Sequence, residues 1–128
     1  MKLLLSVYSI VTAIFGVLSF VLPATVISWY SPLPADALAE TGFRLAGSLG
    51  IGLAILGWYA RRPESGKTRG AIVLAITLTN AFGCIAAWIA AASGSFNGAA
   101  WFEVVSYALW TVAFIVVASI QRSKTPHA

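Results

Sequence analysis

Four long apolar runs constrain this chain more than any other feature of its sequence. A helix of about 20 residues rises about 1.5 Å per residue and covers about 30 Å, the thickness of the hydrocarbon core of a bilayer. The runs lack the alternation of apolar and polar residues that a membrane barrel needs, so they predict helices. The predicted spans are residues 3–22, 41–60, 70–92 and 99–120.

The composition agrees with a chain that is surrounded by lipid. Apolar residues make up 59% of the 128 residues and charged residues only 9%, whereas a typical soluble domain has about 25% charged residues. The mean hydropathy is +0.89. The expected fold is therefore all-α, with residues 1–128 forming one domain, an integral membrane four-helix bundle.

The start of the chain imitates a secretory signal peptide, because Met1 and Lys2 are followed at once by apolar residues. The apolar core of a signal peptide is about 7–15 residues long. Here the apolar run continues through residue 22. We therefore expect an uncleaved spanning helix.

Basic residues lie mainly on one side of the predicted spans. Cytoplasmic loops of membrane proteins carry an excess of Lys and Arg, so this side is predicted to be cytoplasmic, together with both termini. The opposite side offers Arg44 alone. The expected location is the inner (plasma) membrane of a bacterium. The basic side carries Lys2, Arg61, Arg62, Lys67, Arg69, Arg122 and Lys124.

The connections between the runs differ in character. Residues 23–40 contain three prolines together with Trp29 and Tyr30, which is typical of a segment that lies partly at the membrane interface. The connections 61–69 and 93–98 are short, so they predict antiparallel packing of each pair of helices that they join.

Small residues crowd the second predicted span. In lipid, van der Waals packing drives helix association, and small side chains let two backbones approach closely. We predict a packing face toward the helix of residues 70–92 or toward a second copy of the chain. The alternative is that glycine is simply frequent in membrane helices. The residues of the predicted face are Gly47, Gly50, Gly52 and Gly57.

Two ionisable residues, Arg44 and Glu103, lie inside predicted spans, where a charge is costly and often marks a site. Both lie near the non-cytoplasmic ends of their helices, so an ion pair between them is one hypothesis. In the alternative, Arg44 reaches the interface or pairs with Glu40, four residues earlier on the helix, while Glu103 is stabilised by the N-terminal end of its own helix.

Asn80 falls near the centre of the third predicted span, at the depth of Thr12 and Thr111. An amide in hydrocarbon needs hydrogen-bond partners. A structural clamp is therefore the favoured interpretation, and a permeation or substrate site is the alternative.

The chain lacks the residue sets of common reaction types. Its one cysteine, Cys84, allows no disulfide within the chain, and its one histidine, His127, lies in the polar tail. We therefore expect no metal site, no cofactor and no catalytic residue. The basic residues do not alternate with aromatic ones along a stripe, so nucleic-acid binding is not expected.

The second span also carries a resemblance, in residues 43–47 (FRLAG), in Gly50 and Gly52, and in residues 58–62 (WYARR). In these residues and in its layout the chain resembles small bacterial four-helix membrane proteins, some of them loosely grouped as DoxX-like. The resemblance implies a helical bundle and transfers no catalytic residue.

These observations favour a non-catalytic membrane protein, either a homo-oligomer or an accessory subunit of a larger membrane complex. Its expected partners are the lipid bilayer and itself or another membrane protein. A transporter or channel for a small solute or lipophile is the alternative, with Arg44, Glu103 and Asn80 as its ligand-binding or coupling residues. A membrane enzyme that acts on a lipid or quinone is a third, weaker hypothesis.

Overall fold

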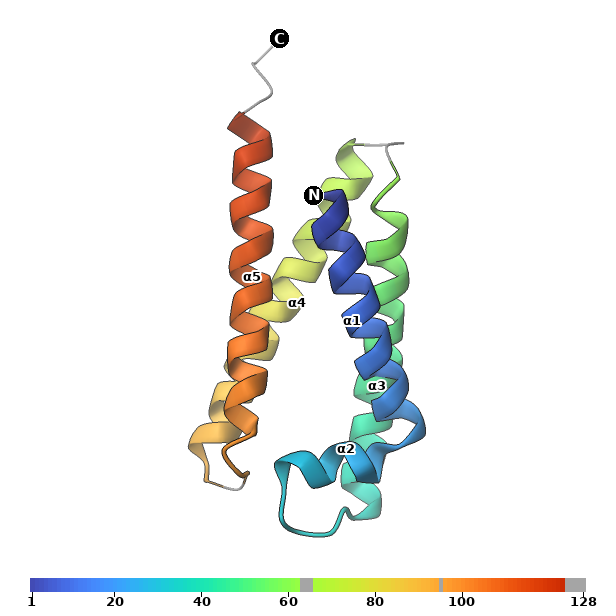
Figure 1. Cartoon of the computed structure of the whole chain (residues 1–128), viewed down its shortest axis with the longest axis vertical. Coiled ribbons are helices and arrows are strands. Elements are labelled where there is room, and N and C mark those ends of the chain that lie inside the picture. Colours follow the sequence, from blue (N-terminus) through green and yellow to red (C-terminus); the bar gives the residue numbers. More distant parts are fainter. Residues whose placement is uncertain (63–65, 95, 124–128) are drawn as a thin grey trace.

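The computed structural model describes residues 1–62, 66–94 and 96–123, and these residues form five helices (Figure 1). Four of the five are long and apolar enough to cross a membrane. The prediction of an all-helical chain with four long apolar helices is therefore confirmed. The helices are α1 (Lys2–Val21), α2 (Pro23–Tyr30), α3 (Ala37–Tyr59), α4 (Gly66–Ala92) and α5 (Ala100–Ser123).

Helix α2 is the element that the sequence analysis did not predict. Leu22 breaks the continuous helix with φ −125° and ψ 53°, and Pro23 follows at the first position of α2, where a missing N–H costs nothing. After α2, Ser31 is extended. Helix α3 then begins at the N-cap Asp36, whose carboxylate accepts a hydrogen bond from the Ala39 amide at 2.7 Å.

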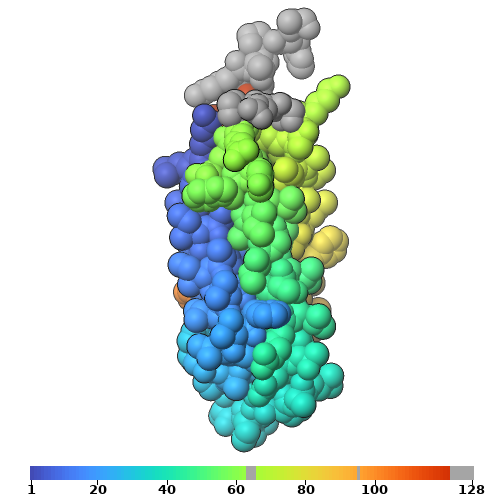
Figure 2. Space-filling view, turned by 90° about the vertical axis from the view of Figure 1, so that its right-hand side faces the viewer, coloured from blue at the N-terminus to red at the C-terminus, as the bar shows by residue number. Residues whose placement is uncertain are grey.

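Helices α1 and α3 pack side by side, as the space-filling view shows (Figure 2). A Cβ atom added at Gly47 would lie 2.6 Å from the Gly16 carbonyl oxygen and 2.7 Å from the Phe20 amide nitrogen. A Cβ atom at Gly16 would lie 2.9 Å from the Gly47 carbonyl oxygen. These glycines set the distance between the two helices.

Three of the four predicted glycines, Gly47, Gly50 and Gly57, face α1, and a Cβ atom at Gly57 would also lie 3.6 Å from the Ile76 side chain of α4. Gly50 also contacts Gly16, and Gly57 faces Ser9 of α1, whereas an added Cβ at Gly52 would meet nothing within 4 Å. The expectation that α3 packs along α4 is wrong, because these two helices contact each other only sparsely.

Helices α4 and α5 form the second pair, as their short connection predicts. The ring of Tyr107 on α5 lies on Gly83 of α4, where an added Cβ would come within 2.8 Å of the ring. Trp88 and Trp101 meet edge to face, with ring centroids 5.2 Å apart. The molecule thus consists of an α1–α3 pair with α2 across one end, and an α4–α5 pair beside it (Figure 1).

The two pairs meet mainly near the end of the molecule that carries Lys2, Arg61, Arg62, Lys67 and Arg69, which we call the basic end. There an apolar cluster joins α1, α4 and α5 with the residue that follows α3. Phe114 and Ile76 are fully buried in this cluster, and Tyr8 contacts Phe114 edge to face. The buried members of the cluster are Leu5, Tyr8, Ala60, Val73, Ile76 and Phe114.

Candidate functional site

At the opposite end, which we call the α2 end, the two helix pairs are joined by polar contacts. The Tyr30 hydroxyl of α2 donates a hydrogen bond to Oε1 of Glu103 on α5, at 2.5 Å. Next to it, the backbone amide of Asn97 donates a hydrogen bond to the Tyr30 carbonyl oxygen at 2.8 Å. The Asn97 side chain donates to the Trp29 carbonyl oxygen at 3.0 Å. These contacts connect α2 to the start of α5, and we call them the polar latch.

The protonation state of Tyr30 determines the direction of its hydrogen bond. Burial and the neighbouring Glu103 carboxylate both raise the pKa of Tyr30 above its usual value. Tyr30 therefore keeps its proton at neutral pH and acts as the donor, while Glu103 accepts. A hydrogen bond to a carboxylate is stronger than one between neutral groups.

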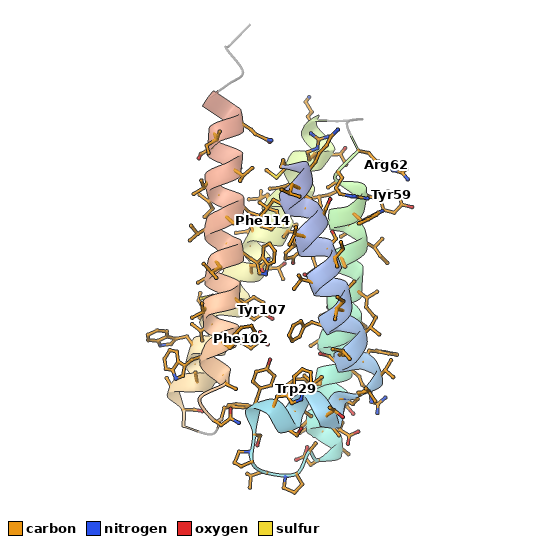
Figure 3. All side chains as sticks on the ribbon, in the orientation of Figure 1. Trp29, Tyr59, Arg62, Phe102, Tyr107 and Phe114 are labelled. Atoms are coloured by element: carbon orange, nitrogen blue, oxygen red, sulfur yellow. The ribbon has the colours of Figure 1, made fainter. Side chains whose placement is uncertain are left out.

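Glu103 lies in the first turn of α5, where the backbone amides at the N-terminus favour a negative charge. Its position is only partly buried. Tyr107 follows one turn later on the same side of the helix. In Figure 3 the Tyr107 and Phe114 side chains lie on the side of α5 that faces α1.

The hypothesised ion pair between Arg44 and Glu103 does not form. Arg44 instead contacts Glu40 at 3.5 Å, one turn earlier on α3, and this is the one ion pair within the described residues. Its guanidinium also donates to the Phe20 carbonyl oxygen at 3.4 Å, and its side chain is 48% exposed. The alternative interpretation of Arg44, with Glu40 as its partner, is the one that the structure shows.

Asn80 is 3% exposed and lies between α4 and α1. Its Nδ2 atom donates to the Tyr8 hydroxyl at 3.2 Å and to the Ile76 carbonyl oxygen at 2.8 Å. Thr12 is a further polar neighbour of the Tyr8 hydroxyl. Thr111 does not join this group, because its hydroxyl donates to the Tyr107 carbonyl oxygen of its own helix.

The three candidate residues therefore do not converge on one point. Glu103 belongs to the polar latch, Asn80 borders the apolar cluster, and Arg44 lies on the exposed side of α3. The glycines Gly47, Gly50 and Gly57 lie in the close contact between α1 and α3, which we call the α1–α3 seam. Among the described residues, His, Cys, Asp and Glu form no group of three that could hold a metal ion.

Three tyrosines that the sequence did not single out as site residues belong to these contacts. Tyr8 and Tyr30 are the partners of Asn80 and Glu103, and Tyr107 packs on Gly83. Tyr107 had a local signal, because it lies four residues after Glu103 and shares its side of the helix. Tyr30 had none, since it lies 73 residues from Glu103.

Chemically, the arrangement offers hydroxyl and amide groups, one carboxylate and aromatic rings. Such groups can hold helices together or bind a small molecule that forms hydrogen bonds. The polar latch and the Asn80–Tyr8 contact both lie between the helix pairs, so a change in either would alter how the pairs are joined.

Comparison with known proteins identifies the family but no activity. No curated protein matches the chain, and no solved structure does. The resemblance to DoxX-like proteins gains no support from these comparisons. One family model matches residues 1–119. The chain therefore belongs to the family that is described as "Domain of unknown function (DUF8292)".

Proposed function

We propose that this protein is a non-catalytic integral membrane protein of the bacterial inner membrane that works as a homo-oligomer or as an accessory subunit. Both termini are cytoplasmic in this proposal. The topology rests on the basic end, because Lys and Arg are enriched in cytoplasmic segments.

The observation that carries the proposal is how little of each long helix is buried within the chain. In the apolar windows of the four long helices, between 11% and 22% of the residues are buried, and α5 has the lowest share. The remaining surface needs lipid or another protein. Along α5, the residues of one side are each at least 46% exposed, namely Phe102, Val105, Leu109, Val112 and Val116.

Native mass spectrometry of the protein, released directly from membranes, tests the assembly. We expect a defined multiple of the chain or a stoichiometric complex with another membrane protein. Disulfide crosslinking then locates the contact, with Leu109→Cys on the exposed side of α5 and Leu74→Cys, exposed on α4, as the matched control, both in a Cys84→Ala background. A chain that is released only as a monomer with lipid contradicts the proposal.

Reporter fusions test the topology separately. A reporter fused after Lys124 is expected to be active only in its cytoplasmic form, and a reporter inserted at Gly98 only in its external form. The reverse pattern contradicts the proposed orientation and leaves the assembly result unaffected.

A transporter or channel for a small solute or lipophile is the second candidate. The observation in its favour is the polar latch, which places a carboxylate between the helix pairs near one end of the spans. Flux of a solute into proteoliposomes, lost in Glu103→Gln and kept in Glu40→Gln, would favour this candidate. Equal flux in both variants would contradict a coupling role for Glu103.

A further inference from the structure

A groove runs between α1 and α3 in the half of the molecule next to the basic end. It has a volume of about 400 Å³. Four of its lining side chains are 45% exposed or more, so the groove opens onto the outer surface of the α1–α3 pair. Its lining residues are Ser9, Ile10, Ala13, Ile51, Ala54, Ile55, Trp58 and Tyr59.

Two arginines stand at the basic end of this groove, on the aromatic rings that line it. The Arg61 guanidinium carbon lies 3.1 Å from the centroid of the Trp58 ring. The Arg62 guanidinium carbon lies 5.0 Å from the centroid of the Tyr59 ring, and Figure 3 shows both of these side chains at the edge of α3. Cation–π contacts of this kind keep the positive charges beside the rings.

Arg61 also links the two helices that form the groove. Its Nη1 atom donates to the Ser6 hydroxyl of α1 at 3.2 Å, and its Nε atom donates to the Trp58 carbonyl oxygen at 3.1 Å. Within the described residues, the one ion pair is that of Arg44 with Glu40, so no described carboxylate neutralises Arg61 or Arg62. The groove therefore combines an apolar length with positive charge at one end.

We propose that this groove binds one anionic phospholipid, with an acyl chain between α1 and α3 and the phosphate beside Arg61 and Arg62. The charge pattern favours an anionic lipid over a zwitterionic one, because each Lys or Arg near an anionic surface contributes about 1 kcal/mol. Trp58 and Tyr59 are the last two residues of α3, and amphipathic rings at the ends of membrane spans prefer the headgroup level. The inference rests on the proposed function in that α1 and α3 must lie in a bilayer.

Lipid retention by the purified protein in detergent tests the inference. Native mass spectrometry compares phosphatidylglycerol with phosphatidylcholine of the same acyl chains. We expect one phosphatidylglycerol to be retained at least fivefold more tightly. Equal retention of the two lipids would show that lipid binds without headgroup selectivity, and this result would overturn the proposal.

Two variants separate the headgroup contact from the acyl-chain contact. Arg62→Gln should reduce the preference for phosphatidylglycerol about fivefold, whereas Lys67→Gln, exposed at the same end, should not. Ala13→Phe fills the groove and should abolish selective retention, whereas Ala75→Phe on an exposed side of α4 should not. If Ala13→Phe does not fold, Ile10→Trp fills the groove from a position that is 51% exposed.

Glycerol phosphate, a headgroup without acyl chains, provides a further control. It should not bind measurably, because it has no acyl chain that could fill the apolar groove. Selective retention that survives both the Arg62→Gln and the groove-filling variants would overturn the proposed site. The assay needs no membrane orientation, so its failure and a failed topology or assembly test are distinguishable.

Discussion

Between α1 and α3 the two backbones touch, whereas the α1–α3 and α4–α5 pairs meet mainly at the two ends of the molecule. The first contact depends on glycines at Gly16 and Gly47, where even one additional carbon atom would collide with backbone. The second depends on an apolar cluster at the basic end and on the polar latch at the α2 end. The seam is therefore sensitive to added volume, and the ends are sensitive to lost contacts.

The largest expected effect comes from adding volume to the seam. Gly47→Leu would drive a side chain into the Gly16 carbonyl and the Phe20 amide, and neither backbone group can move aside without separating the helices. Overpacking costs about 1–3 kcal/mol where side chains can adjust, so here we expect a loss of at least about 3 kcal/mol. Thermal melts in detergent measure it.

Gly52→Leu is the matched control, because an added Cβ at Gly52 meets nothing within 4 Å. It should melt close to wild type. If both leucine variants melt alike, the close seam between α1 and α3 is wrong.

The next effect comes from removing volume at the basic end. Phe114 is fully buried and its ring contacts the Tyr8 ring, with centroids 5.2 Å apart. Phe114→Ala should destabilise the protein by about 2 kcal/mol, less than the 3–5 kcal/mol that is usual in water-soluble cores, because lipid is itself apolar. Thermal melts should show Phe82→Ala, at a position 68% exposed on α4, to be nearly neutral. Equal losses would contradict the apolar cluster.

At the α2 end the effect should be smaller and should depend on both partners. Tyr30→Phe removes the donor and Glu103→Gln removes the charge of the acceptor. Hydrogen bonds between membrane helices contribute on average about 0.6 kcal/mol and at most about 1.7 kcal/mol, so we expect a coupling energy of about 1 kcal/mol in a double-mutant cycle. Tyr59→Phe, an exposed tyrosine, serves as the control. Additive losses would contradict the polar latch.

The four long helices were predictable because each apolar run is as long as a bilayer is thick and admits one kind of secondary structure. Helix α2 has only eight residues, and its sequence resembles an interfacial loop with prolines on both sides. The local sequence pattern could not distinguish a short helix from such a loop, because the helix depends on the break at Leu22 and on packing against α3.

The site was predictable only in part, because its contacts join residues that lie far apart in the sequence and depend on which helices pack together. The chemistry of Glu103 drew attention to it, but its partner Tyr30 lies far away in sequence. The glycine face of α3 was visible, yet loop length suggested α4 as its partner. The true partner, α1, presents a single glycine, Gly16, and a single glycine is a weak signal.

The smallest expected effect concerns Arg44, the residue that the sequence suggested as the partner of Glu103. Arg44 lies 3.5 Å from Glu40 and is about half exposed, so water or headgroups compete for its charge. An exposed pair with this spacing on a helix contributes about 0.3–0.5 kcal/mol and is weakened by salt. A cycle with Arg44→Gln and Glu40→Gln should therefore show a coupling of that size, lower at high salt.

The parallel cycle with Arg44→Leu and Glu103→Leu should be additive, because the two side chains have separate partners. Breaking a buried ion pair would instead cost about 3–5 kcal/mol for either single variant. A coupling above about 1 kcal/mol between Arg44 and Glu103 would mean that the charges meet across the helix pairs. The polar latch would then not be the contact that joins the α2 end.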